Sequence, residues 1–314
     1  NFFALTKKYS SSNDKNSTDE IKEFKKLVSS LHKNGIEVIL DVVYNHTAEG
    51  GSGGKVYNFK AMDENTFYTK SKNNIFVNFS GCGNTLNCNH KVVKDMIIQS
   101  LLYWYLETGV DGFRFDLMGI HDIETMRQIR EALDEIDPRI LTYGEGWDMG
   151  TGLLPLDKAK KDNAFELPNI GFFNDTERDA IKGAEVYGGL KAGFVSGQAT
   201  ESIVAKAILG SSELGTYLEP KQVVNYVEAH DNYNLHDLLA ELHPDDDELT
   251  RTKRIELATA MSLLLQGMSF MELGQEFSRS KLVATGANGN TIQADHKRAM
   301  NSYNAPDAVN QVDW

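Results

Sequence analysis

The sequence contains no long apolar run and few basic residues. None of its apolar stretches approaches the roughly 20 residues that a membrane-spanning helix needs, so we expect no membrane span. The first residues, 1–12, do not resemble a signal peptide either. Lys and Arg number 32 against 45 Asp and Glu, which gives a formal charge of −13. Such a surface repels nucleic-acid phosphates and anionic membranes, so we expect neither as a partner, and a neutral substrate fits better.

Cysteine is also scarce. Cys82 and Cys88 lie six positions apart in a Gly- and Asn-rich segment. They could close a small disulfide, but two reduced thiols are the default expectation. Neither has a metal-ligand pattern nearby, and no Asp- or Asn-rich loop has the ligand spacing of a calcium site. We therefore predict no metal and no other cofactor.

Repeats of solenoid length and low-complexity tracts are absent as well. The chain instead alternates short apolar strands with amphipathic helices. The first predicted helix, 18–34, places Ile21, Phe24, Leu27, Val28 and Leu31 on one face, and Gly35 ends it. The β-branched run 36–44 then indicates a strand buried on both faces. The same reasoning predicts helices at 93–109, 122–136 and 248–266, and strands at 110–117, 140–147, 169–174, 223–229 and 269–274.

Strict alternation of strands and helices predicts a parallel sheet with right-handed crossovers. An open doubly wound sheet and a closed barrel both satisfy that pattern. Four of the strands end in acidic or histidine-bearing clusters, which is how a barrel assembles a site from the carboxyl ends of several strands. An open sheet would gather its ligand at one switch point, usually with a Gly-rich phosphate loop, and no such loop follows the first strand. The pattern therefore favours a (β/α)8 barrel of the triosephosphate isomerase type.

Residues 47–89 are too long for an ordinary connection from strand to helix. The segment is rich in Gly, Asn and aromatic residues. We interpret it as an extended loop that covers the catalytic face, although the aromatic residues of a long loop often form only its own small core.

Two strand ends carry carboxylates with an unusual setting. In the segment 112–116, Arg114 and Asp116 share one face of the strand, so the guanidinium is expected to keep Asp116 ionised, as a nucleophile requires. A plain buried ion pair is the alternative. On the next strand, Glu145 stands between two glycines, where a partly dry pocket would raise its pKa and suit a general acid. A separation of about 5–5.5 Å between the two carboxyl groups would mean a retaining, double-displacement mechanism at a glycosidic bond.

Two further clusters complete the set. His46 follows the strand at 36–44, and His230 with Asp231 follows the strand at 223–229. The histidines could donate hydrogen bonds to sugar hydroxyls, and Asp231 could stabilise a cationic transition state. A single histidine at a strand end is more often structural, but four clusters in order on one predicted face favour a functional site.

The four clusters together resemble the characteristic segments of the α-amylase superfamily, glycoside hydrolase family 13. Those segments are Asp41-Val42-Val43-Tyr44-Asn45-His46, Gly112-Phe113-Arg114-Phe115-Asp116, Gly144-Glu145-Gly146-Trp147 and His230-Asp231. The resemblance implies that Asp116 is the nucleophile, Glu145 the acid/base and Asp231 the transition-state stabiliser. It also implies that His46, Arg114 and His230, with Tyr44 and Trp147, bind the substrate.

Finer features are similar to type I pullulanases, which cleave α-1,6 branch linkages in pullulan, amylopectin and glycogen-derived dextrins. These features are Phe115-Asp116-Leu117-Met118-Gly119, Tyr143-Gly144-Glu145-Gly146-Trp147, Ile170-Gly171-Phe172-Phe173-Asn174-Asp175, Gly274-Gln275-Glu276-Phe277 and Asn301-Ser302-Tyr303-Asn304-Ala305-Pro306-Asp307. Isoamylases share residues 41–50 and 81–83 and are the nearest alternative. An α-1,4-acting or branching member, or a non-catalytic glucan-binding relative, are the others. Such non-catalytic relatives typically lose the carboxylates that are present here.

The resemblance further implies an incomplete barrel in which strands 3 to 8 are evident and strands 1 and 2 are not. The family's Tyr-Asn-Trp-Gly-Tyr-Asp-Pro motif, whose tyrosine stacks on the substrate, has no counterpart in the sequence. Nor have a C-terminal β-sandwich or N-terminal binding domains. We therefore expect residues 1–314 to be an internal fragment of a catalytic barrel that binds an α-glucan and is inactive alone. Calcium is known in the superfamily and stays open, as do the oligomeric state and the location, in a bacterium, between secreted or cell-surface and cytoplasmic.

Overall fold

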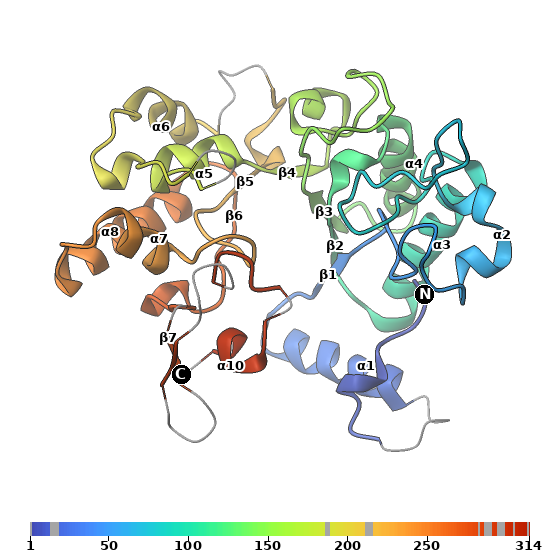
Figure 1. Cartoon of the computed structure of the whole chain (residues 1–314), viewed down its shortest axis with the longest axis horizontal. Helices are drawn as coiled ribbons and strands as arrows, with labels where there is room; N and C mark the ends of the chain where they lie inside the picture. Colours follow the sequence, from blue (N-terminus) through green and yellow to red (C-terminus); the bar gives the residue numbers. More distant parts are fainter. Residues whose placement is uncertain are drawn as a thin grey trace. The chain divides into compact units, whose positions relative to one another are not determined.

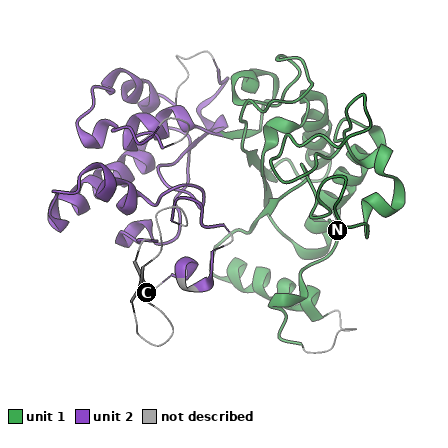
Figure 2. Ribbon diagram, viewed as in Figure 1, with its two compact units in different colours: residues 1–172 green, residues 173–314 purple. Residues whose placement is uncertain are grey.

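The computed structural model describes residues 2–12, 19–185, 189–210, 216–281, 283–285, 291–293, 299–303, 305–312 and 314. The chain divides into two compact units, Asn1–Phe172 and Phe173–Trp314, shown in green and purple in Figure 2. Each unit is described by itself.

The helices and strands are labelled in Figure 1. The helices are α1 (Asp19–Lys33), α2 (Phe59–Phe67), α3 (Lys91–Thr108), α4 (Ile123–Asp134), α5 (Asp175–Lys182), α6 (Glu201–Ile208), α7 (Leu235–Leu242), α8 (Glu248–Leu264) and α10 (Asp307–Asn310). The strands are β1 (Ile39–Val42), β2 (Gly112–Phe115), β3 (Leu141–Gly144), β4 (Gly171–Phe173), β5 (Val223–Asn225), β6 (Met268–Ser269), β7 (Val283–Thr285) and β8 (Thr291–Gln293). Short 3-10 turns lie at Lys7–Tyr9, Met118–Ile120, Lys161–Glu166, Phe194–Ser196, Pro220–Gln222 and Gln275–Phe277.

In the part of the chain that the structure describes, the main sheet has the strand order β1-β2-β3-β4-β5-β6. The pairings β1/β2, β2/β3, β3/β4 and β5/β6 are parallel, and β1 and β6 are the two ends of the order. Each of these strands lies within a predicted strand or overlaps its beginning. The chain therefore has the predicted α/β fold, with the parallel sheet of an incomplete (β/α)8 barrel.

In unit 1, helices α3 and α4 form as their sequences predict. The α3 helix begins after His90, whose side chain accepts a hydrogen bond from the Val92 N–H, and it ends at Gly109, which has φ +76°. The α4 helix begins after Asp122, whose carboxylate accepts from the Thr125 N–H. Both helices bury an apolar face around β2, whose Phe113 and Phe115 are 0% exposed. The buried helical residues include Val93, Ile97, Leu101, Met126, Ile129 and Leu133.

The first strand and helix differ from the prediction. The strand is shorter than the run 36–44, and β1 is not buried on both faces, because Asp41 is exposed and Ile36 is 51% exposed. On α1 the buried residue is Val28, whereas Leu27 is 53% exposed. The physical reason is that β1 stands at the end of the described strand order, so one neighbour covers it instead of two.

In unit 2, the short helices escaped prediction. Helices α5, α6 and α7 have 8 residues each, which is too short for a clear helical period to stand out. They pack with α8 around a buried apolar cluster that includes Ile181, Val204, Leu235, Leu239, Ile255 and Ala258. The last predicted strand, 269–274, is wrong in its bounds, because β6 covers Met268–Ser269 and a turn follows. The strands β7 and β8 pair as an antiparallel hairpin that was not predicted.

The segment 47–89 between β1 and α3 is structured rather than a plain loop. It contains α2 and two isolated antiparallel bridges, Tyr68 with Leu86 and Lys70 with Phe76. Phe59 and Phe67 stack with ring centroids 4.7 Å apart, so part of its aromatic content does form a local core. Among the described residues of both units, no helix combines the length and apolarity needed to cross a bilayer.

Candidate active site

Arg114 joins three carboxylates at the carboxyl ends of β1, β2 and β3. Its Nη1 donates to Asp41 Oδ1 at 2.8 Å and lies 3.4 Å from Asp116 Oδ1, and its Nη2 donates to Glu145 Oε1 at 2.7 Å. The parallel register places Arg114 opposite Asp41 on one side and Tyr143 on the other, which brings the neighbouring strand ends within its reach. Unit 1 thus brings together Asp116 and Glu145, the two carboxylates that the sequence predicts for the reaction.

The charge state of Arg114 is set by these acids. Burial opposes its charge, but the attraction of Glu145, Asp41 and Asp116 outweighs that effect and raises the pKa of Arg114 above its usual range. The guanidinium is therefore a fixed positive charge between the carboxylates. The side chain of Asp116 is 24% exposed and that of Glu145 is 7% exposed, so a ligand from solvent reaches Asp116 more easily.

The first predicted cluster contacts the same carboxylate. Asn45 Nδ2 donates to both the carbonyl oxygen and Oδ2 of Asp116, at 2.9 and 2.8 Å. Asn45 Oδ1 in turn lies 2.5 Å from His46 Nδ1, so this ring nitrogen carries the proton. Burial lowers the pKa of His46 more than the nearby Asp116 raises it. His46 is thus held as a neutral, half-buried imidazole beside Asp116.

Glu145 lies between two glycines that cannot be replaced without displacement of their neighbours. A Cβ at Gly144 would lie 2.6 Å from the Phe115 carbonyl oxygen, and one at Gly146 would lie 2.5 Å from the ring of Phe172. Burial opposes the charged carboxylate of Glu145, whereas hydrogen bonds from Arg114 and from the Leu117 N–H, at 2.9 Å, favour it. The predicted rise in the pKa of Glu145 stays a prediction.

Leu117 follows Asp116 in a left-handed conformation, with φ 43° and ψ 47°. This region is unfavourable for a branched residue by roughly 1–3 kcal/mol. The turn aims the Leu117 N–H at Glu145 Oε2. Backbone strain at this position therefore serves the contact between the second and third clusters.

Two of the residues predicted to bind substrate lie deeper than expected. Tyr44 is 2% exposed, its hydroxyl is 2.8 Å from Ser100 Oγ, and its ring packs edge-on against Phe2. This burial disagrees with direct substrate contact, so Tyr44 is better assigned to the core that supports the first cluster. Trp147 is half-buried, and its carbonyl group approaches Gly119 so closely that a Cβ there would lie 1.9 Å from the oxygen.

The fourth cluster belongs to unit 2. The side chains of His230 and Asp231 are 48% and 53% exposed and lie 3.8 Å apart. They precede Asn232, which has φ 65°, on the segment between β5 and α7. Lys281 Nζ donates to the His230 carbonyl oxygen at 3.4 Å. The fourth cluster thus presents two polar side chains to solvent, as a binding role requires.

Sequence reasoning missed three contributors to this site. Asp41 and Asn45 belong to the first segment but received no role, and the Leu117 N–H is a backbone group. Asn45 was within reach of prediction, because it is a polar residue directly after an apolar strand. The contribution of Leu117 depends on a backbone conformation that no side-chain pattern reveals.

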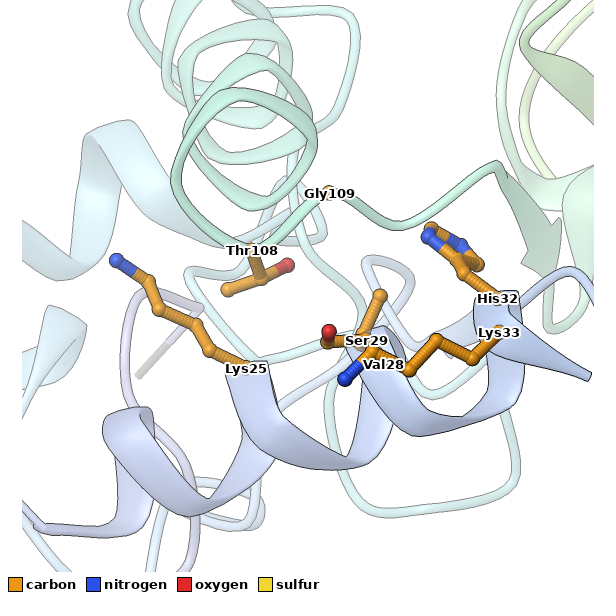
Figure 3. Close-up of a pocket in the computed structure, with 7 residues that line it drawn as sticks. All are labelled: Lys25, Val28, Ser29, His32, Lys33, Thr108 and Gly109. Atoms are coloured by element: carbon orange, nitrogen blue, oxygen red, sulfur yellow. The ribbon is translucent and has the colours of Figure 1, made fainter.

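A groove of about 380 Å³ lies elsewhere in unit 1. Figure 3 shows its lining: Lys25, Val28, Ser29, His32 and Lys33 on α1, and Thr108 and Gly109 at the end of α3. The end of α3 leads into the first residues of β2, so the groove is at the opposite end of that strand from Asp116. It contains none of the predicted site residues.

No group of three or more His, Cys, Asp or Glu side chains in the described ranges could hold a metal ion. The residues present therefore do not provide a carboxylate-rich site for the calcium known in related enzymes, and no step of the reaction is assigned to one. Cys82 and Cys88 are free thiols, the first exposed and the second buried.

Comparisons with known proteins agree with this geometry. The family model for the α-amylase catalytic domain matches residues 7–311. The chain is 37% identical over 298 residues to a pullulanase of Bacillus subtilis, covering 93% of this chain and 39% of that protein. It is 36% identical over 269 residues to the chloroplastic isoamylase SU1 of Zea mays, covering 76% of this chain and 32% of that protein.

A solved structure gives the same answer. A pullulanase from Anoxybacillus sp., crystallised with maltotetraose, superposes with a TM-score of 0.82 at 42% identity, covering 94% of this chain and 40% of that one. The chain thus spans between a third and two fifths of the length of the relatives it matches. With the ordered strand-end clusters, the parallel sheet and the family match in agreement, this chain belongs to the α-amylase family and represents its catalytic domain.

Proposed function

We propose that the protein to which these residues belong is a retaining glycoside hydrolase that cleaves α-1,6-glucosidic linkages in branched α-glucans. The observation that carries the proposal is the bridge from Arg114 to both Asp116 and Glu145. One guanidinium reaches both carboxylates, which is compatible with the separation of about 5–5.5 Å that double displacement needs. The pullulanase and isoamylase relatives support the α-1,6 linkage, and the maltotetraose bound to one of them supports an α-glucan substrate.

In the first step, Asp116 attacks the anomeric carbon of the branch unit. The bond from that carbon to the glycosidic oxygen breaks, a covalent ester to Asp116 forms, and Glu145 gives its proton to the leaving oxygen. Asn45 occupies Oδ2 of Asp116, so Oδ1 is the oxygen that faces Arg114 and is less firmly held. We assign the attack to Oδ1.

In the second step, Glu145 takes a proton from water, and the resulting hydroxide attacks the anomeric carbon and releases Asp116. Asp231 stabilises the positive charge that develops on the sugar ring in both steps. His46 and His230 bind hydroxyl groups of that sugar, and the neutral state of His46 lets its second ring nitrogen accept a hydrogen bond.

The decisive experiment uses the natural full-length protein with pullulan. Release of maltotriose supports the proposal, whereas release of panose or isopanose, or cleavage of linear α-1,4 chains alone, contradicts it. Incubation with a fluorinated glycosyl donor followed by peptide mass spectrometry should then place the covalent sugar on Asp116. A label on any other residue would overturn the assignment of roles.

Isoamylase-like specificity is the second candidate, because the Zea mays isoamylase matches nearly as well as the pullulanases. Both candidates share the chemistry and differ in the polymer they prefer. The ratio of kcat/KM for pullulan to that for glycogen distinguishes them. A ratio well above one favours a pullulanase, and the reverse favours an isoamylase.

A further inference from the structure

Glu49 is a buried acid that the proposed reaction does not use. It is 1% exposed and lies in the extended segment that follows the first cluster. Its carboxylate accepts backbone hydrogen bonds from Tyr57, Asn58, Phe59 and Lys60, at 2.9–3.4 Å, and a further one from the Tyr68 hydroxyl at 2.6 Å.

The four N–H groups belong to the start of α2, which has no side-chain cap of its own. The first turn of a helix leaves its N–H groups without partners, and its dipole favours a negative charge. Burial raises the pKa of Glu49, but the hydrogen bonds from Tyr68 and the backbone lower it further, so the net shift is downward. The charged carboxylate is thus the form that holds this segment together.

A relay of hydroxyl groups connects Glu49 to the first cluster. The Tyr68 hydroxyl gives its proton to Glu49, so it must accept one from Thr47 Oγ1, which lies 2.7 Å away. Thr47 is the residue after His46. Its N–H and carbonyl are also bound by the side chain of Asn84, at 3.0 and 2.8 Å, and Asn84 is 0% exposed.

These contacts fix the backbone on one side of His46, and Asn45 fixes its ring on the other. The Asn45 carbonyl accepts from the Leu86 N–H at 2.9 Å, and the Asn45 side chain binds Asp116. We propose that Glu49 is a positioning residue of the active site, which acts through Tyr68 and Thr47 to hold His46 against Asn45 and Asp116. The inference rests on the proposed function, in which His46 binds the sugar under attack.

The variants that test it are Glu49→Gln, Tyr68→Phe and Thr47→Val in the natural full-length protein. The matched control is Asp63→Asn, which also converts an acid of α2 to its amide. Asp63 is exposed and accepts only from Asn65 and Thr66 within the same segment, outside the relay.

On pullulan, we expect Glu49→Gln to lower kcat by about 10- to 100-fold, with a smaller change in KM, because a displaced group at the reacting sugar costs that much. The hydroxyl variants should each lower kcat several-fold, and Asp63→Asn should leave it unchanged. The double variant Glu49→Gln/Tyr68→Phe should be no slower than Glu49→Gln alone, because both act through one relay. Additive losses, or equal losses in Asp63→Asn, would overturn the proposal.

A second readout does not depend on catalysis. NMR titration should find the pKa of His46 below its ordinary value in the wild type and shifted upward in the three relay variants, because a loosened ring gains water. The His46→Gln variant identifies its resonance. If Glu49→Gln fails to fold, the two hydroxyl variants decide, and an unchanged His46 pKa in both refutes the proposal. A wild type that cleaves no α-1,6 linkage refutes the proposed function and leaves the titration to judge the role of Glu49.

Discussion

The side-chain amide of Asn45 donates to Asp116 twice, once to its carbonyl oxygen and once to Oδ2. One nitrogen thereby fixes both the backbone and the carboxylate of the residue that we propose attacks the sugar. The carboxylate cannot rotate without loss of the bond at 2.8 Å, so its other oxygen keeps one direction.

The first prediction concerns that amide. Asn45→Ala should lower kcat/KM by about 100-fold, because the carboxylate of Asp116 is no longer held in the direction of attack. It should also cost about 1–3 kcal/mol of stability, because Asn45 is fully buried. Steady-state kinetics and urea unfolding measure the two effects. The control is Asn34→Ala, which removes an exposed amide that donates to the Ser30 carbonyl; kinetics that match between the two variants would contradict the role of Asn45.

The second prediction separates the two carboxylates of the reaction. Asp116→Asn should remove nearly all activity, roughly 10⁴-fold or more, because the covalent route is lost. Glu145→Gln should cost about 10²–10⁴-fold with a poor leaving group and much less with a glycosyl fluoride, whose departure needs no proton. Circular dichroism should show both variants folded. Loss of folding in either would favour the buried ion-pair interpretation instead.

The third prediction concerns the close packing at Gly146. A Cβ at this position would lie 2.5 Å from Phe172 Cδ1 and 2.7 Å from the Lys161 nitrogen, so Gly146→Ala should destabilise the protein by about 1–3 kcal/mol. Gly150→Ala is the control, because its Cβ would meet nothing within 4 Å. The midpoint of chemical unfolding should fall for the first variant and stay near the wild type for the second. Equal midpoints would show that the strand end yields to the methyl group.

The fourth prediction is a dependence of stability on pH through His121. This residue is 0% exposed, neither ring nitrogen has a hydrogen-bond partner in the described part of the chain, and burial lowers its pKa from 6.5 to about 4. Between those values the unfolded histidine binds a proton and the folded one does not. Its contribution is therefore constant above pH 6.5 and falls as the pH drops toward 4, by about 3 kcal/mol in total.

His121→Leu should remove this part of the slope. The free energy of unfolding of the wild type and the variant, measured between pH 4.5 and 7.5, gives the difference directly. The variant should gain on the wild type as the pH falls. Parallel curves would mean that the imidazole has a partner or water in solution.

The fifth prediction concerns the thiols. Cys82 is exposed and Cys88 is 2% exposed, so a thiol reagent should modify Cys82 in the native protein and reach Cys88 only after unfolding. The modification of Cys82 should be slow at neutral pH, because burial and the nearby Asp116 both raise its pKa. Peptide mass spectrometry after alkylation with and without denaturant checks this. A Cys82–Cys88 disulfide in the purified protein would contradict it.

Sequence reasoning recovered what depends on period and order. The pattern of Phe113, Arg114, Phe115 and Asp116 correctly assigned rings to the core and charges to the site, because a strand alternates its faces. It could not find α2, since the acid that caps this helix, Glu49, lies outside it. Nor could it find that Tyr44 is buried, because a tyrosine at a strand end suits either a core or a ligand. Contacts between distant residues and backbone conformations were the information that local patterns lacked.

The extended segment carries its own anchor, which has a consequence for how such enzymes diversify. The reacting carboxylates are fixed by the sheet through Arg114, whereas residues 47–89 are fixed by Glu49 and Asn84, and Thr47 is the joint between the two. Mutations beyond that joint can reshape the wall that meets the polymer without disturbing the bond-breaking groups. Linkage or polymer preference can therefore drift in this lineage while the chemistry stays constant.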